Sequence, residues 1–172
     1  MVVLAIGLLR VRFTMRVVIS GSTENDIRLI EMSVAESGFD VSLVISGGAK
    51  GIDTLAVEWA VENNIPVEVF EAAWDNLDHP DAIIKTSPWG QKYDAKAGLR
   101  RNELMAVHAD ALIAIWDGQS KGTKHMIKMA RKRDLPIFVY RTDIPCKTGH
   151  LKRENKKEFY ARLTKLANDH GW

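Results

Sequence analysis

Apolar residues form two kinds of pattern along this chain. Short apolar runs rich in β-branched residues recur at 16–20, 41–46, 66–70, 111–115 and 137–140. Such runs are typical of buried strands in a parallel sheet. Apolar residues at helical spacing fill the intervals 25–37, 52–63, 97–108 and 124–133. Strands separated by helices predict an α/β fold, a Rossmann-like, doubly wound and mostly parallel sheet of about five strands flanked by helices.

One internal segment breaks this alternation. Residues 72–95 have little periodicity and contain Trp74, Trp89 and two prolines, Pro80 and Pro88. A loop of this length inside a compact domain is usually functional, so we expect it to lie over a ligand crevice. A simple surface insertion is the alternative interpretation.

The two ends of the chain also lie outside the alternation. Residues 1–9 are apolar, and Met15 stands directly before the first predicted strand. We therefore expect residues 1–14 to be an N-terminal extension or a mis-assigned start, with an extra edge strand at Val2–Leu9 as the alternative. Residues 15–172 are predicted to form one domain, in which a loop at 141–152 leads to an amphipathic C-terminal helix at 154–168.

Composition excludes several classes of protein. The 172 residues, 46% hydrophobic and 27% charged, fit a globular chain with a full core. The single cysteine, Cys146, excludes an internal disulfide and a cysteine-rich metal site, so a cytoplasmic setting is the default. The five histidines show no metal-ligand spacing, and we expect neither a metal nor a cofactor. The apolar start is too short to span a bilayer and precedes its arginines, so neither a membrane partner nor a signal peptide is expected.

Candidate chemistry gathers where the predicted strands end. The strand at 41–46 leads into Gly47-Gly48-Ala49-Lys50-Gly51-Ile52-Asp53, and a helix follows. A glycine-rich turn before a helix lets a phosphate approach backbone N–H groups, and the helix dipole favours negative charge there. The segment lacks both the spacing of a dinucleotide fingerprint and the Gly-Lys-Ser/Thr ending of a P-loop. It predicts a phosphate-binding turn of another kind, the alternative being a tight turn alone.

A second turn, Asp117–Thr123, follows the strand at 111–115, with Thr123 as a candidate helix cap. Because parallel strands end at one edge of a sheet, where ligands bind, the two turns should meet. Trp116 is expected either to stack on a base or to close the core. Near a helix start, Arg100-Arg101-Asn102 places a guanidinium that can grip phosphate with two hydrogen bonds. The predicted ligand-binding residues are Gly21, Ser22, Gly47, Gly48, Ala49, Lys50, Gly51, Asp53, Arg101, Asn102, Asp117, Gly118, Ser120, Gly122 and Thr123.

These motifs resemble known families. Ser46–Asp53 is similar to the Ser-Gly-x-Ala-x-Gly-Ile-Asp signature of the DNA-processing protein DprA (Smf), and Arg101-Asn102 resembles the Arg-Asn pair of that family. The pattern from Ala97 to Thr123 resembles LOG-type phosphoribohydrolases. Together they resemble the SLOG superfamily, and in particular its small stand-alone YspA-like branch of bacteria and their phages, over residues 16–140. The resemblance implies a Rossmann-like fold and a homo-oligomer, since LOG and DprA relatives pair through helices.

The chain departs from the LOG pattern at the position that carries the chemistry. LOG enzymes have a catalytic Glu after their Gly-Thr pair, whereas Lys124, His125 and Met126 follow Thr123 here. Hydrolysis of an N-glycosidic bond needs a group that stabilises an oxocarbenium-like centre or activates water. The catalytic residues are therefore unassigned, and the candidates are Asp53, Glu103, Asp117 and Arg101.

Three functions are consistent with these residues. The leading hypothesis is binding of a nucleotide or nucleotide-derived phosphorylated ligand, with Arg101 neutralising charge and Asn102 and Asp117 orienting the sugar. The first alternative is a LOG-like N-glycosidic hydrolase or transferase that acts on nucleoside monophosphates. The second is a DprA-like single-stranded DNA-binding module, which the small net charge of +2 does not favour.

Overall fold

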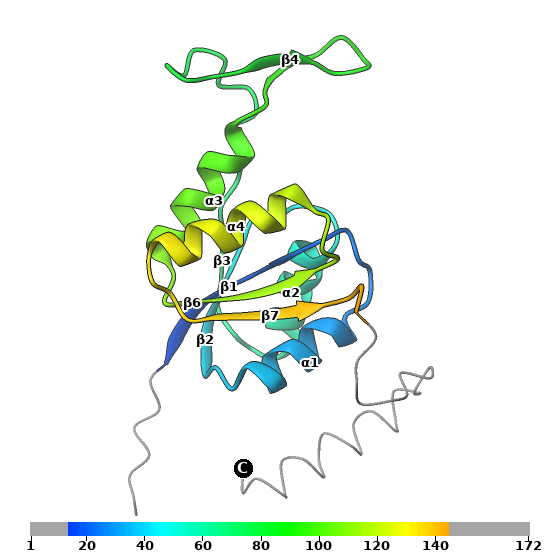
Figure 1. Ribbon diagram of the computed structural model, residues 1–172, viewed down its shortest axis with the longest axis vertical. Helices are drawn as coiled ribbons and strands as arrows, with labels where there is room; N and C mark the ends of the chain where they lie inside the picture. The colour runs from blue at the N-terminus through cyan, green and yellow to red at the C-terminus, as the bar shows by residue number, and fades with distance from the viewer. Residues whose placement is uncertain (1–13, 145–172) are drawn as a thin grey trace, which may run out of the picture.

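The structure, a computed structural model, describes residues 14–144. Its central sheet has five parallel strands in the order β3-β2-β1-β6-β7 (Figure 1), namely β1 (Met15–Gly21), β2 (Val41–Ser46), β3 (Val67–Val69), β6 (Ala111–Trp116) and β7 (Ile137–Arg141). The helices in this part of the chain are α1 (Arg28–Ser37), α2 (Ile52–Glu62), α3 (Ala97–His108) and α4 (Lys121–Lys132). The predicted Rossmann-like α/β fold is confirmed.

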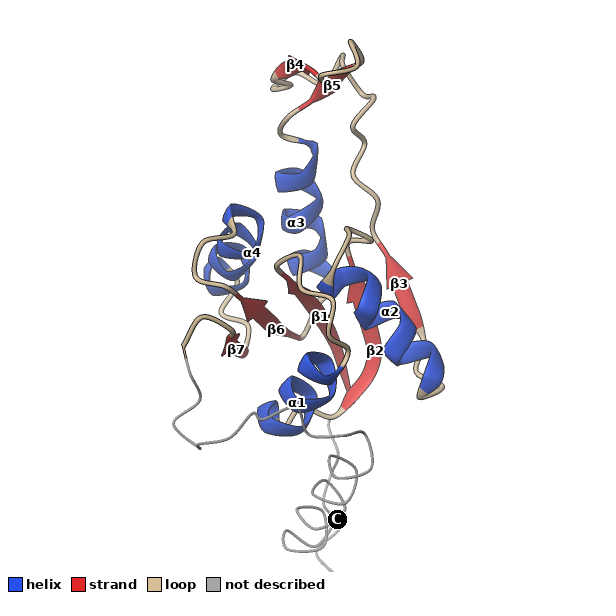
Figure 2. Ribbon diagram, turned by 90° about the vertical axis from the view of Figure 1, so that its right-hand side faces the viewer, coloured by secondary structure: helices blue, strands red, loops and turns tan. Residues whose placement is uncertain are grey.

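Helices cover both faces of the sheet (Figure 2). Successive side chains of a strand point to opposite faces of the sheet, so a strand contributes side chains to the hydrophobic core on each face. Val17 and Ile19 of β1 pack in a core with α1 and α2, whereas Val18 packs in a second core with α3 and α4. Because the central strands are buried on both faces, their sequences read as continuous apolar runs instead of alternating ones.

The chain changes faces between the two neighbouring strands β1 and β6. Residues Val17 to Gly21 of β1 pair in parallel with Ala111 to Ile115 of β6. The connection after β1 leads into α1 on one face, and the connection after β6 leads into α4 on the other face. The carboxyl ends of β1 and β6 therefore form the topological switch point, where open α/β sheets bind ligands.

Most predicted element bounds agree with the structure, and two helix starts do not. The bounds of β2 and α3 match the prediction, and Gly38 ends α1 in the left-handed region at φ 68°. In contrast, α1 begins three residues later than predicted, at Arg28, and α4 begins three residues earlier, at Lys121. The N-cap of α4 is Ser120, whose hydroxyl accepts a hydrogen bond from the Thr123 N–H, so Thr123 is not the cap.

Residues 72–95 are not the structureless cover that the sequence predicted. They contain an antiparallel hairpin of β4 (Ile84–Thr86) and β5 (Lys92–Asp94). The hairpin stands beyond the N-terminal end of α3 and away from the sheet edge (Figures 1 and 2), so it does not lie over the crevice. Strands of three residues are too short to show a period of two, which explains why sequence patterning missed them.

Several predictions fall outside the described residues. These are the N-terminal extension at 1–14, apart from Thr14, and the C-terminal helix at 154–168. Within residues 14–144, none of the helices has the length and apolar character needed to cross a membrane.

Candidate ligand site at the carboxyl edge of the sheet

Helix α3 ties together the two glycine-containing turns at the carboxyl edge. From this helix, the Arg101 Nη1 atom donates a hydrogen bond to the carbonyl of Gly47, which follows β2. The next residue, Asn102, donates from Nδ2 to the carbonyl of Gly122 in the first turn of α4, at 3.2 Å. The Arg101 Nε atom also donates to the Asn102 Oδ1 atom at 3.1 Å, so the two side chains act as one brace. The structure thus brings the three predicted segments together.

Asp53 lies on the inner side of the first turn and is 3% exposed. One of its carboxylate oxygens accepts a hydrogen bond from the Gly21 N–H at 3.2 Å. Burial raises the pKa of Asp53 above its ordinary value, while Arg101 and the Gly21 N–H act in the opposite direction. Burial also lowers the pKa of Arg101, and the nearby Asp53 opposes this change. A carboxylate and a guanidinium thus face each other across the Gly47 backbone in a partly dehydrated setting.

The first turn is held close to the end of β1. The Ile52 N–H donates to the Ser22 carbonyl at 3.3 Å. A Cβ atom on Gly51 would lie 2.7 Å from the Thr23 Cα atom, and the φ of Gly51 is +94°, so only glycine fits there without strain. This contact sets the N-terminus of α2 beside the switch point between β1 and β6.

The second turn is organised by Asp117. One of its carboxylate oxygens accepts hydrogen bonds from the backbone N–H groups of Gln119 and Ser120, at 2.9 and 2.7 Å. These bonds lower the pKa of Asp117, so its carboxylate stays ionised at neutral pH. The Asp117 N–H donates to the Ser22 hydroxyl at 3.1 Å, which links the second turn directly to the end of β1.

The predicted residues at this edge fall into two groups. Gly48, Ala49 and Lys50 are exposed on the first turn, open to a ligand. Asn102 and Thr123 are 5% and 2% exposed, so they support the edge from below it, Asn102 by bracing Gly122 and Thr123 by donating to the Ser120 hydroxyl. Glu103, a catalytic candidate from sequence, is not brought to this edge, because it lines a surface hollow with Met129, Lys132 and Arg133 of α4 and its C-terminal end.

At the same edge lies Arg141, which was not predicted from the sequence, beside Trp116, which was. Arg141, at the end of β7, places its guanidinium 5.0 Å from the Trp116 ring centroid and pairs with Asp143 at 2.7 Å. Trp116 also donates from its indole nitrogen to the Ser120 carbonyl at 3.1 Å, so it supports the second turn. The only sequence signal for Arg141 was its position directly after the last predicted strand. The hydrogen bond to Asp143 raises the pKa of Arg141, and the charges of Asp143 and Asp117 act in the same direction, so Arg141 is a second guanidinium near Asp117.

Comparison with known proteins agrees with this architecture. A model of the YspA, cpYpsA-related SLOG family matches residues 15–77. The Gene 61 protein of Mycobacterium phage D29 is 32% identical over 104 residues, which cover 57% of this chain and 70% of that protein. The chain belongs to the SLOG family. The match covers β1 through β3, and so includes the first glycine turn.

Two solved structures share the SLOG fold with this chain. DNA processing protein A (DprA) from Streptococcus pneumoniae superimposes with a TM-score of 0.54 at 17% identity, over 88% of this chain. DprA from Helicobacter pylori, which binds single-stranded DNA, superimposes with a TM-score of 0.50 at 19% identity, over 73% of this chain. The chain spans 56% and 64% of the lengths of these two proteins. At these identities the likeness concerns the fold alone.

No cluster of three or more metal-ligating side chains occurs among the residues that the structure describes. The carboxyl edge presents backbone N–H groups, the carboxylates of Asp53 and Asp117, the exposed Lys50 and the two guanidinium groups of Arg101 and Arg141. This combination of fixed dipoles and cations is suited to holding an anion with hydroxyl groups beside it.

Proposed function

We propose that this SLOG chain binds a nucleotide or a nucleotide-derived phosphorylated ligand at the carboxyl edge of its sheet. The observation that carries the proposal is the brace made by Arg101 and Asn102, which joins the Gly47 carbonyl to the Gly122 carbonyl across two strand-to-helix turns. Two helix N-termini held side by side in this way offer N–H groups and positive dipole ends to one anion.

The positions of the site residues suggest a separate role for each of them. The Nη1 and Nε atoms of Arg101 donate hydrogen bonds to the Gly47 carbonyl and to Asn102 Oδ1, whereas its Nη2 atom makes no hydrogen bond within residues 14–144. We assign that atom to the phosphate, together with the exposed turn residues Gly48, Ala49 and Lys50. Asp117 is ionised, and its own turn fixes its carboxylate. We assign this carboxylate to accept a hydrogen bond from a ribose hydroxyl. Asn102 is a positioning residue because its amide is buried in the brace.

A thermal-shift screen with nucleoside mono-, di- and cyclic phosphates tests this proposal. Ligand at a hundred times its Kd stabilises the folded state by about 2.7 kcal/mol, which raises Tm by several degrees. We expect Lys50→Ala, an exposed change, to weaken the shift and Arg101→Ala to abolish it. Arg131→Ala, an exposed change at the far end of α4, is the matched control and should retain the full shift. Absence of a shift with every nucleotide at millimolar concentration contradicts the proposal.

Single-stranded DNA is a second candidate ligand for the same edge, favoured by the shared fold with Helicobacter pylori DprA, which binds it. Binding of a polyanion through several phosphates weakens steeply with salt, unlike binding of one nucleotide. Fluorescence anisotropy of a labelled oligonucleotide between roughly 50 and 200 mM salt, the range over which such contacts lose affinity, separates the two ligands. Hydrolysis of an N-glycosidic bond has less support, since Met126 stands near the LOG carboxylate position and Glu103 lies elsewhere.

A further inference from the structure

Exposed apolar side chains are concentrated on one part of the molecule. Ten large apolar side chains are exposed in the described part of the chain, and seven of them lie on the hairpin, on the segment leading to it or on α3. These seven are Trp74, Ile83, Ile84, Trp89, Leu99, Leu104 and Val107. Isolated exposed apolar residues need no explanation, but such a concentration marks an interaction surface.

The hairpin carries the most exposed of these side chains. Trp89, in the turn between β4 and β5, is 90% exposed, and Ile84 of β4 is 44% exposed. No other element of the described chain lies beside the two strands (Figures 1 and 2). An isolated two-stranded hairpin is at best marginally stable in water, so this one gains from a partner that covers it.

The second part of the apolar surface is the outer face of α3. Leu99, Leu104 and Val107 are 39%, 50% and 48% exposed, whereas Met105 and Ala106 of the same helix are buried in the core. Helical spacing places the three exposed residues on the side of α3 that faces away from the sheet. The hairpin and this face are thus two apolar surfaces on one chain that do not cover each other.

The charges around these apolar surfaces indicate which kind of partner binds them. Residues 82–93 of the hairpin contain Lys85 and Lys92 and no acidic residue. Residues 71–81, which precede the hairpin, contain Glu71, Asp75, Asp78 and Asp81 and no lysine or arginine. Within the described residues, neither lysine forms an ion pair, and the first three acidic residues form none. The surface is therefore complementary to itself, whereas its acidic stretch repels a nucleic acid.

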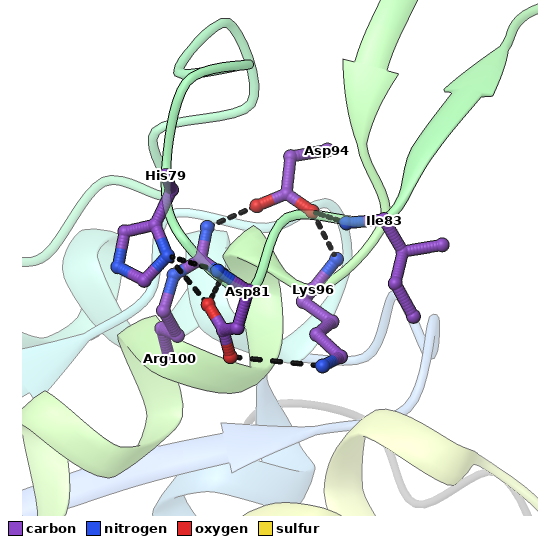
Figure 3. Close-up of polar contacts among 6 residues, drawn as sticks. All are labelled: His79, Asp81, Ile83, Asp94, Lys96 and Arg100. Carbon is purple, nitrogen blue, oxygen red and sulfur yellow. Dashed lines mark hydrogen bonds and ion pairs between the residues drawn. The ribbon is translucent and has the colours of Figure 1, made fainter.

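The base of the hairpin is fixed to α3 by a polar cluster around the buried carboxylate of Asp94 (Figure 3). Fully buried Asp94 accepts hydrogen bonds from the backbone N–H groups of Ile83 and Lys96, at 2.8 and 3.0 Å, and from the Arg100 guanidinium. Arg100 also pairs with Asp81 at 2.8 Å. The hairpin is consequently presented in a defined direction from the start of α3, so less conformational entropy is lost when a partner binds it.

We propose that the hairpin is an arm that packs against α3 of a second copy of this chain, in a two-fold symmetric dimer. Ile83, Ile84 and Trp89 of one copy would cover the outer face of α3 on the other, and Lys85 and Lys92 would meet the acidic stretch at 71–81. A two-fold axis repeats this contact, so each copy gives and receives one arm. A stable interface buries about 800 Å² on each partner, and one tryptophan supplies about 150–250 Å². The arm alone is smaller than this, but each copy also contributes the outer face of α3, Lys85, Lys92 and the acidic stretch to the same interface.

Sedimentation velocity and light scattering on the full chain test the dimer. We expect a particle of twice the 19.3 kDa chain mass, and the variant Ile84→Ser/Trp89→Ser should sediment with the mass of one chain. Val61→Ser is the matched control, because Val61 is 66% exposed on α2, far from the arm, and this variant should stay dimeric. Circular dichroism on each variant checks that the sheet domain remains folded.

Charge reversal tests the orientation of the two copies. Lys85→Glu/Lys92→Glu should dissociate the dimer, and adding Asp75→Lys/Asp78→Lys should restore it, because the complementary charges are then exchanged. A wild-type chain that is monomeric up to about 100 μM, a hundredfold above a micromolar Kd, overturns the proposal. So does a dimer that persists in Ile84→Ser/Trp89→Ser. If the wild type is monomeric and its oligonucleotide binding requires Trp89, the arm is a base-stacking surface instead. Nucleotide thermal shifts on the same variants report separately on the sheet-edge site.

Discussion

Gly47 is the residue at which the candidate site tolerates least change. It is buried between the Arg101 guanidinium and Asp53, and a Cβ atom there would overlap Arg101 and lie 2.7 Å from the Asp53 Oδ2 atom. The requirement for glycine comes from this close approach of two charged side chains, and not from backbone conformation. The sequence indicated a glycine that serves a ligand, and the structure shows one that first serves the brace between α3 and the turn.

Replacing Gly47 with alanine should therefore displace Arg101 and destabilise the fold. We expect the free energy of unfolding to fall by about 1–3 kcal/mol, the usual cost of adding an atom to a close-packed region. Gly122→Ala is the matched control, because nothing lies within 4 Å of the Cβ position there and alanine favours a helix by up to about 1 kcal/mol. Urea denaturation of both variants measures the difference, and equal effects would contradict the proposed packing.

At the scale of elements, α3 joins the two halves of the molecule through three consecutive residues. Arg100 binds the base of the hairpin, Arg101 binds the turn after β2, and Asn102 binds the first turn of α4. Consecutive residues of a helix point in directions about 100° apart, so this division of contacts follows from helix geometry. Motif matching singled out Arg101-Asn102 and gave Arg100 no separate role, because the hairpin that Arg100 binds was not visible in the sequence.

The anchoring of the hairpin should depend on pH through Asp94. Its hydrogen bonds to Lys96, Ile83 and Arg100 outweigh its burial and lower its pKa from 3.8 to about 2. A lowered carboxylate pKa means that the stabilisation is complete above the ordinary pKa and is lost as the pH falls toward about 2. The amide proton shifts of Ile83 and Lys96, followed by NMR from pH 6 downward, should show a midpoint near about 2. Asp94→Asn should remove this transition, and a midpoint near 3.8 would contradict the anchor.

At the scale of the whole molecule, stability resides in the doubly covered sheet. The central strands β1 and β6 contribute fully buried side chains to both cores, for example Ile19 and Ile113 to one and Val18 and Leu112 to the other. The hairpin adds exposed apolar surface to the molecule and little core. Folding therefore depends on the sheet, which leaves the arm available for contacts between chains.

A pair of truncations to alanine should show this distribution. Leu112→Ala empties a fully buried position on β6 and should cost about 2–5 kcal/mol. Val61→Ala, at a position that is 66% exposed on α2, should change stability by no more than about 0.5 kcal/mol. Thermal unfolding monitored by circular dichroism compares the two variants. Similar losses for both would show that the core is not where the structure places it.

Local patterns along the chain were enough to predict the elements of the central sheet and the segments that meet at its edge. Continuous apolar runs such as 111–115 are specific to strands buried on both faces, and parallel strands necessarily end at one edge, so the Gly47 and Asp117 turns were expected to be neighbours. The glycine motifs also identified the family. These features are local in sequence, or follow from topology alone, and patterning therefore captures them.

Only the tertiary structure decided which side chains face a ligand and which hold the site together. Asn102 is buried against Gly122, Glu103 lies in a hollow away from the edge, and Arg141 comes to the edge from β7. Each of these placements depends on contacts between elements distant in sequence, which neither periodicity nor a motif encodes. The direction of the hairpin is likewise set by side-chain contacts and not by a local pattern, because Arg100 pairs with Asp94 and Asp81 only once α3 and the hairpin have packed.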